Sequence, residues 1–137
     1  MSTATDNLQA AFKHAMAIRP QVGGFPVLAE VLRVAGVRRN VWSLPSAQSV
    51  YETEHGPVVL QGVPLLTGMA DVPAFDEAAL ITCLRADQTG QTTFPQFLEA
   101  AWKAGVVRYE VDFAARTVVY EGVQGERYTE SYPAVQV

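Results

Sequence analysis

The chain has 137 residues, of which 49% are hydrophobic and 18% are charged, and this composition indicates a globular protein rather than a disordered one. Its net charge of −4 disfavours nucleic acid as a partner, because a phosphate backbone is bound through clustered positive charge. One cysteine excludes an intramolecular disulfide, and no apolar run reaches the ~18 residues of a membrane span. We expect a cytoplasmic protein that binds neither nucleic acid nor membranes.

The first half of the chain predicts two helices followed by three strands. An amphipathic helix is expected over Thr5–Arg19 and is stopped by Pro20. A second helix should follow, with Pro26 in its first turn and Gly36 as its C-cap. The second helix and the three strands are expected at Phe25–Ala35, Val37–Leu44, Gln48–Thr53 and Val58–Gln61.

The second half predicts the same order of elements. Its second helix should begin with a capping box formed by Thr93 and Gln96, and Gly105 should be its C-cap. The two helices and three strands are expected at Ala74–Ala86, Phe94–Ala104, Val106–Phe113, Arg116–Val123 and Glu126–Glu130.

The two halves are also related in sequence at an offset of 69 residues. Between Phe25 and Pro64 the shifted chain shows 12 identities in 40 ungapped positions, whereas ordinary residue usage predicts roughly two or three. We interpret this as a tandem duplication, with repeats at about 5–66 and 74–135 in a single domain, 1–137. The predicted fold is α+β, with a pseudo-twofold axis, helices on one side, and antiparallel strands in one sheet or two abutting sheets.

An arginine and a glutamate recur in both repeats. An even hairpin loop places Arg39 opposite Glu52 and Arg108 opposite Glu121. These pairs are either surface ion pairs or two symmetry-related sites that recognise an anion. Tyr51 and Tyr120 also correspond at the offset of 69. With the neighbouring tyrosines they either pack under the helices or line a cleft at the junction of the repeats.

The strand beginning at Val37 has apolar residues on both faces, unlike its counterpart in the second repeat. A sheet with one solvated face usually alternates more cleanly. We therefore predict an interface at Val37, Val41 and Trp42, through which the chain forms a homodimer or binds another protein.

Motifs for metal or cofactor chemistry are missing from the sequence. The Asp87–Leu98 stretch resembles an EF-hand loop, but Arg85 and Gln96 occupy the two positions where calcium needs carboxylates, which excludes a calcium site. Two histidines and one cysteine, none closely spaced, do not make a zinc site. We predict no catalytic residues, no metal and no cofactor.

The second repeat carries a recognisable pattern. It includes Phe94-Pro95, an Ala104-Gly105-Val106 run followed by Arg108-Tyr109, and then Tyr120 and Gly125-Glu126. This pattern resembles the YbcV-like family of small bacterial and prophage proteins, a domain of unknown function sometimes labelled phage envelope protein. The resemblance implies no established activity and no catalytic residues.

Taken together, these features favour a non-enzymatic interaction or regulatory protein of a bacterial or prophage genome. The alternative is a small-ligand-binding protein or enzyme whose site lies at the repeat junction and uses Arg39, Arg108 and the tyrosines. A deep pocket would favour the alternative, and a flat apolar surface around Val41 and Trp42 would favour the first prediction.

Overall fold

The computed structural model describes residues 2–20 and 22–137. Helix α1 (Thr3–Ile18) begins at Ser2, whose side chain accepts a hydrogen bond from the Thr5 amide, and α2 (Phe25–Val34) has Pro26 in its first turn. The three strands of the first half follow as β1 (Val37–Ser43), β2 (Gln48–Thr53) and β3 (Gly56–Gln61).

The second half repeats this order, with a shorter first helix and shorter strands. Helix α3 (Glu77–Gln88) is capped by Asp76, and α4 (Phe94–Lys103) begins with the predicted capping box of Thr93 and Gln96. The remaining strands are β4 (Arg108–Asp112), β5 (Thr117–Glu121) and β6 (Arg127–Ser131). The predicted α+β architecture, with a helix–helix–strand–strand–strand unit occurring twice, is therefore confirmed.

All six strands form one antiparallel sheet in the order β3-β2-β1-β4-β5-β6. The central strands β1 and β4 pair with Val41 opposite Glu110, and these positions differ by 69 residues. On either side of this pair, Arg39 faces Asp112 and Ser43 faces Arg108. Adding 69 to 39 and 43 gives 108 and 112, so the register is symmetric about the Val41–Glu110 pair.

Backbone conformations recur at the same spacing. Gly36 and Gly105, which end α2 and α4, have φ angles of 94° and 88°. In the hairpins that join the first two strands of each half, Ala47 and Arg116 also occupy the left-handed region, with φ angles of 51° and 56°. Equivalent positions in the two halves thus adopt equivalent turns, even where the residue types differ.

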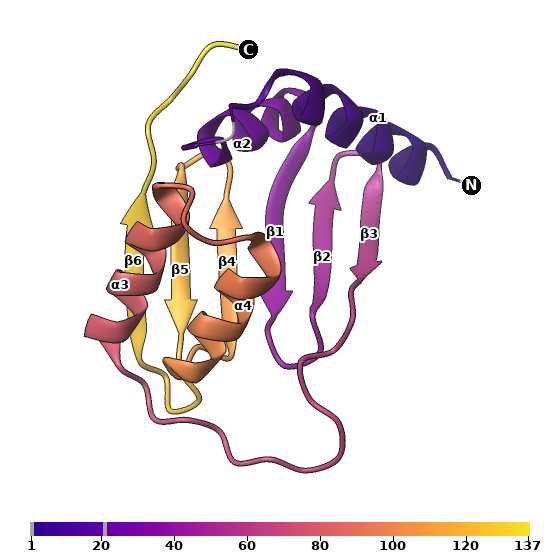
Figure 1. Cartoon of the computed structure of the whole chain (residues 1–137). Helices are drawn as coiled ribbons and strands as arrows, with labels where there is room; N and C mark the ends of the chain where they lie inside the picture. Colours follow the sequence, from indigo (N-terminus) through magenta and orange to yellow (C-terminus); the bar gives the residue numbers. More distant parts are fainter. Residues whose placement is uncertain (1, 21) are drawn as a thin grey trace.

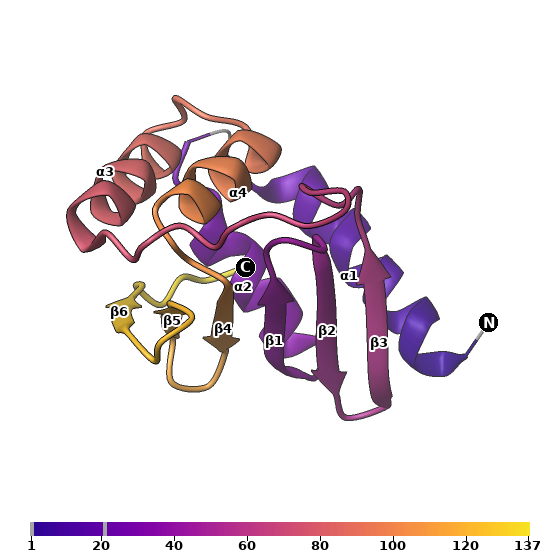
Figure 2. The same cartoon turned by 90° about the horizontal axis from the view of Figure 1, so that it is seen from below.

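The four helices are displaced toward opposite ends of one sheet face. Helices α3 and α4 lie over β4–β6, whereas α1 and α2 cross the other end of the strands (Figure 1). Seen along the strands, the face opposite α3 and α4 carries no helix (Figure 2). We call the helix-covered face the inner face and the bare one the outer face. None of the described helices combines the length and apolarity needed to cross a bilayer.

One hydrophobic cluster draws on both halves of the chain. It includes Leu8 and Leu32 from the first helix pair, Leu80 and Trp102 from the second, and Phe113 from the sheet. The burial of these side chains against the inner face is the main favourable contribution to folding, at about 25 cal/mol per Å² of apolar surface. The same cluster includes Trp42, Tyr109 and Tyr120 of the sheet.

Candidate functional site

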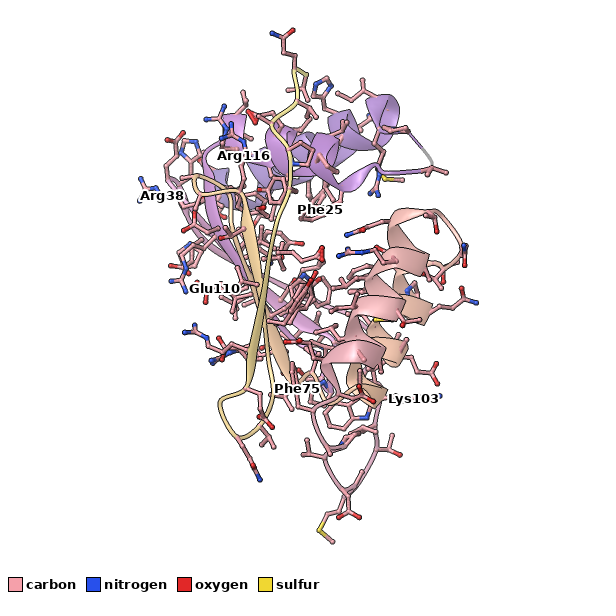
Figure 3. All side chains as sticks on the ribbon, turned by 90° about the vertical axis from the view of Figure 1, so that its left-hand side faces the viewer. Phe25, Arg38, Phe75, Lys103, Glu110 and Arg116 are labelled. Carbon is pink, nitrogen blue, oxygen red and sulfur yellow. The ribbon has the colours of Figure 1, made fainter. Side chains whose placement is uncertain are left out.

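The inner face of the sheet is the floor of a large cleft between the two helix pairs. The cleft has a volume of about 1160 Å³, which is somewhat larger than the roughly 300–1,000 Å³ of small-molecule sites. Residues of α1 and α2 line one wall, and residues of α3 and α4 line the other. The cleft therefore lies at the junction of the repeats, and Figure 3 shows Phe25 on the side of the sheet that carries α3 and α4.

A row of aromatic rings crosses the floor of this cleft, and we call it the aromatic row. It consists of Trp42, Tyr109 and Tyr120, which face one another across neighbouring strands. The Trp42 and Tyr109 rings are stacked with centroids 6.0 Å apart, and the Tyr109 and Tyr120 centroids are 5.4 Å apart. Phe94, at the start of α4, extends the row by an edge contact with Trp42.

Polar groups on the cleft floor are few and are held at defined positions. The Asn40 side-chain amide donates a hydrogen bond to the Val50 carbonyl at 3.2 Å, and Tyr51 lies opposite Asn40 on β2. Burial raises the pKa of the Tyr51, Tyr109 and Tyr120 hydroxyls above the usual range. These hydroxyls therefore stay protonated near neutral pH and can donate hydrogen bonds to a ligand, but they are poor general bases.

The mouth of the cleft is unusually apolar for a surface. Met16 of α1 is 69% exposed, Phe94 is 44% exposed, and Leu60 and Val63 flank the end of β3. Single exposed apolar residues are common, but here several surround one opening. This arrangement suits the entry of an apolar molecule.

The predicted arginine–glutamate pairs form, but they lie on the outer face. Arg108 contacts Glu121 at 2.6 Å, and Arg39 contacts Glu52 at 3.0 Å and also Glu110. Arg127 adds a longer contact of 3.5 Å to Glu121. Figure 3 shows Arg38 and Glu110 on this side of the sheet, facing away from α3 and α4.

The prediction of one junction site that uses both these arginines and the tyrosines is therefore wrong. Tyr51 and Tyr120 line the cleft, whereas their sequence neighbours Glu52 and Glu121 are on the outer face. Successive residues of a strand point to opposite faces, so an arginine that pairs with Glu52 or Glu121 cannot reach the cleft.

Two of the three residues predicted to form an interface are buried instead. Val37 is 2% exposed and Trp42 is 9% exposed, because both side chains pack in the core. Val41 alone is on the outer face, where it is half-buried between β2 and β4. The mixed apolar pattern of β1 thus has two separate causes: Trp42 contributes to the cleft floor, and Val41 contributes to the bare face.

Sequence reasoning misses part of the cleft. The pattern of β1 assigns Trp42 to an interface, and no motif singles out Asn40, Asp87 or Phe94 as lining residues, although all four line the cleft. The relevant signal is the tyrosine correspondence between the repeats, which indicates a junction cleft. Among the described residues, no group of three His, Cys, Asp or Glu side chains is arranged to hold a metal ion.

Comparisons with known proteins show a family without assigned chemistry. The family described as "Protein of unknown function (DUF1398)" matches residues 21–130. An uncharacterized protein of Mycobacterium bovis is 58% identical over 136 residues, which cover 99% of this chain and 83% of the relative. Uncharacterized proteins from the CDC 1551 and H37Rv strains of Mycobacterium tuberculosis match with the same identity and coverage.

Proposed function

We propose that this chain, which belongs to the DUF1398 family of proteins of unknown function, binds a small, largely apolar ligand in the junction cleft. The supporting observation is a cleft of about 1160 Å³ with an aromatic floor and few polar groups. Small-molecule sites typically combine an apolar concave wall with a small number of fixed hydrogen-bonding groups. We propose binding rather than catalysis because the floor hydroxyls are held protonated by burial.

The experiment is a titration with N-phenyl-1-naphthylamine, a neutral apolar dye that fluoresces when it leaves water. We expect the native chain to bind it, and Leu28→Arg to weaken binding about tenfold or more, because a charged side chain would enter the apolar wall. Val34→Arg is the matched control: it makes the same change on the same helix, at an exposed residue that does not line the cleft.

A second variant protects this test if Leu28→Arg does not fold, which circular dichroism would reveal. Phe94→Ala removes an exposed ring from the mouth and should also weaken dye binding while the fold is kept. The proposal fails if the native chain does not bind the dye, or if folded Leu28→Arg and Phe94→Ala both bind it as tightly as the native chain does.

The outer face supports a second candidate function, which is interaction with another copy of the chain. Val59, Val50, Val41 and Val119 form a row across four strands, interrupted by Glu110, and we call this the valine row. No described helix covers it (Figure 2). In each half an arginine and a glutamate lie beside the row, as Arg39 with Glu52 and Arg108 with Glu121. Positive groups on one copy can therefore meet negative groups on another.

Three further proposals concern origin and location. The symmetric register about Val41 and Glu110 supports descent of both halves from one duplicated segment. The pattern from Phe94 to Glu126 supports a relation to the YbcV-like proteins and to prophage genomes. We also propose a cytoplasmic location, where Cys83 would stay reduced.

A further inference from the structure

Asp87 is a half-buried carboxylate at the wall of the junction cleft. It lies in the last turn of α3 and lines the cleft together with Tyr109 and Tyr120. Among the described residues, its carboxylate accepts one side-chain hydrogen bond, a long one of 3.5 Å from the Thr92 hydroxyl. None of the salt bridges among the described residues includes Asp87.

Asp87 lines the same cleft as Tyr109 and Tyr120, and its charge acts on both hydroxyls. Its negative charge contributes to the raised pKa of both Tyr109 and Tyr120, although burial is the larger cause in each case. Burial also raises the pKa of Asp87 itself, and Arg19 only partly opposes this effect. A carboxylate removed from water without an ion pair is costly, and a cationic ligand would lower that cost.

The aromatic row offers a second attraction for a positive charge. The faces of Trp and Tyr rings carry partial negative charge and bind ammonium groups by about 0.5–2 kcal/mol, more strongly when water is excluded. Trp42, Tyr109 and Tyr120 are each less than 10% exposed, so their contacts with a ligand would be largely dry.

The remaining charges of the cleft disfavour an anionic ligand. Among the lining residues that the structure describes, Arg19 is the one cation, and it is on the exposed connection between α1 and α2, against Gly24. Glu130 also lines the cleft but is already paired, with Arg85 at 2.8 Å. The described lining residues therefore carry one positive and two negative charges. Of the two carboxylates, Glu130 has an ion-pair partner among the described residues and Asp87 has none.

We infer that the ligand preferred by this cleft is an organic monocation, in which an ammonium group is attached to an aromatic or aliphatic body. The ammonium group sits between the Asp87 carboxylate and the faces of the aromatic row, and the apolar body extends toward the mouth near Phe94 and Met16. This inference rests on the proposed function, because it names the ligand class for the same cleft.

The test is competition against N-phenyl-1-naphthylamine by three molecules of similar size: 2-phenylethylamine, 2-phenylethanol and phenylacetate. At pH 7 these are a cation, a neutral molecule and an anion. We expect the amine to bind about tenfold more tightly than the alcohol, and phenylacetate to bind most weakly. Asp87→Asn should remove most of the preference for the amine, with only the attraction to the aromatic row remaining, and should leave the affinity of the alcohol unchanged.

Asp71→Asn is the control, since it removes an exposed carboxylate that does not line the cleft. The inference is overturned if the native chain binds amine and alcohol equally, or if Asp87→Asn keeps the amine preference. In both cases binding of the alcohol and the dye would still support the proposed function. Failure of the native chain to bind the dye and all three molecules would instead remove the proposed function.

Discussion

At the scale of single residues, burial determines which side chains are reactive. The thiol of Cys83 lies on α3 one turn before Asp87 and is half-buried. Burial raises its pKa to about 11, and the negative charge of Asp87 adds to this effect. Because the thiolate is the nucleophile, Cys83 is expected to be inert near neutral pH and is unsuited to covalent catalysis.

This leads to a prediction for alkylation of Cys83 by iodoacetamide at pH 8. The raised pKa lowers the thiolate fraction about 100-fold, and the greater nucleophilicity of a more basic thiolate offsets about tenfold of this. We therefore expect alkylation of the folded chain to be roughly tenfold slower than alkylation of the chain unfolded in guanidinium. Mass spectrometry over time gives both rates, and equal rates would contradict the predicted burial of the thiol.

At the scale of elements, the end of α4 is tied to the start of α3 through Gly105. The Asp76 amide, at the cap of α3, donates a hydrogen bond to the Ala104 carbonyl at 2.8 Å. Gly105 follows with a φ of 88°, and a Cβ atom there would lie 2.5 Å from the Ala74 carbonyl oxygen. Glycine is thus required at this position both by its backbone conformation and by the close approach of another segment.

Two alanine variants separate these requirements. Gly125 has a φ of 87°, but a Cβ atom there would have no neighbour within 4 Å, so Gly125→Ala adds only the left-handed strain of about 1–2 kcal/mol. Gly105→Ala adds the same strain and a backbone clash, and we expect it to lower the free energy of unfolding by about 1–3 kcal/mol more. Urea denaturation measures both values, and equal losses would show that the close approach has no energetic consequence.

At the scale of the whole molecule, the position of the cleft follows from the symmetric arrangement of the two halves. Each half places its helix pair on the same sheet face, and the register about Val41 and Glu110 sends the two pairs toward opposite ends of that face (Figure 1). The aromatic row forms the floor of the cleft between the two helix pairs. No described helix covers the outer face (Figure 2), where the valine row forms an apolar surface of the sheet.

The proposed self-association can be tested by sedimentation. We expect the native chain to form a dimer, and Val41→Lys to raise the dimer dissociation constant about tenfold or more, because it places a charge in the valine row. Val123→Lys is the control, since Val123 is exposed in the turn between β5 and β6 and outside that row. A monomer at all concentrations for the native chain would remove this candidate and leave the cleft unaffected.

Local pattern is sufficient to predict the elements and the strand pairing within each hairpin. Capping by Thr93 and Gln96 and left-handed glycines at Gly36 and Gly105 are short-range signals, and the structure contains each of them. The pairing of Arg108 with Glu121 follows from hairpin geometry alone. Strand alternation also implies that Tyr51 and Glu52 point to opposite faces of the sheet. This rule already excludes a junction site that uses both the tyrosines and the arginines paired with Glu52 and Glu121.

The sequence by itself therefore determined the elements, their order in each half and the hairpins, because these depend on residues close together along the chain. Only the tertiary structure decided that β1 pairs with β4 in the middle of one sheet, that Trp42 is in the core while Val41 is not, and that Asp87 and Tyr109 line the same cleft. These outcomes depend on how elements far apart in sequence pack together, and the burial that results sets the charge and access of each side chain.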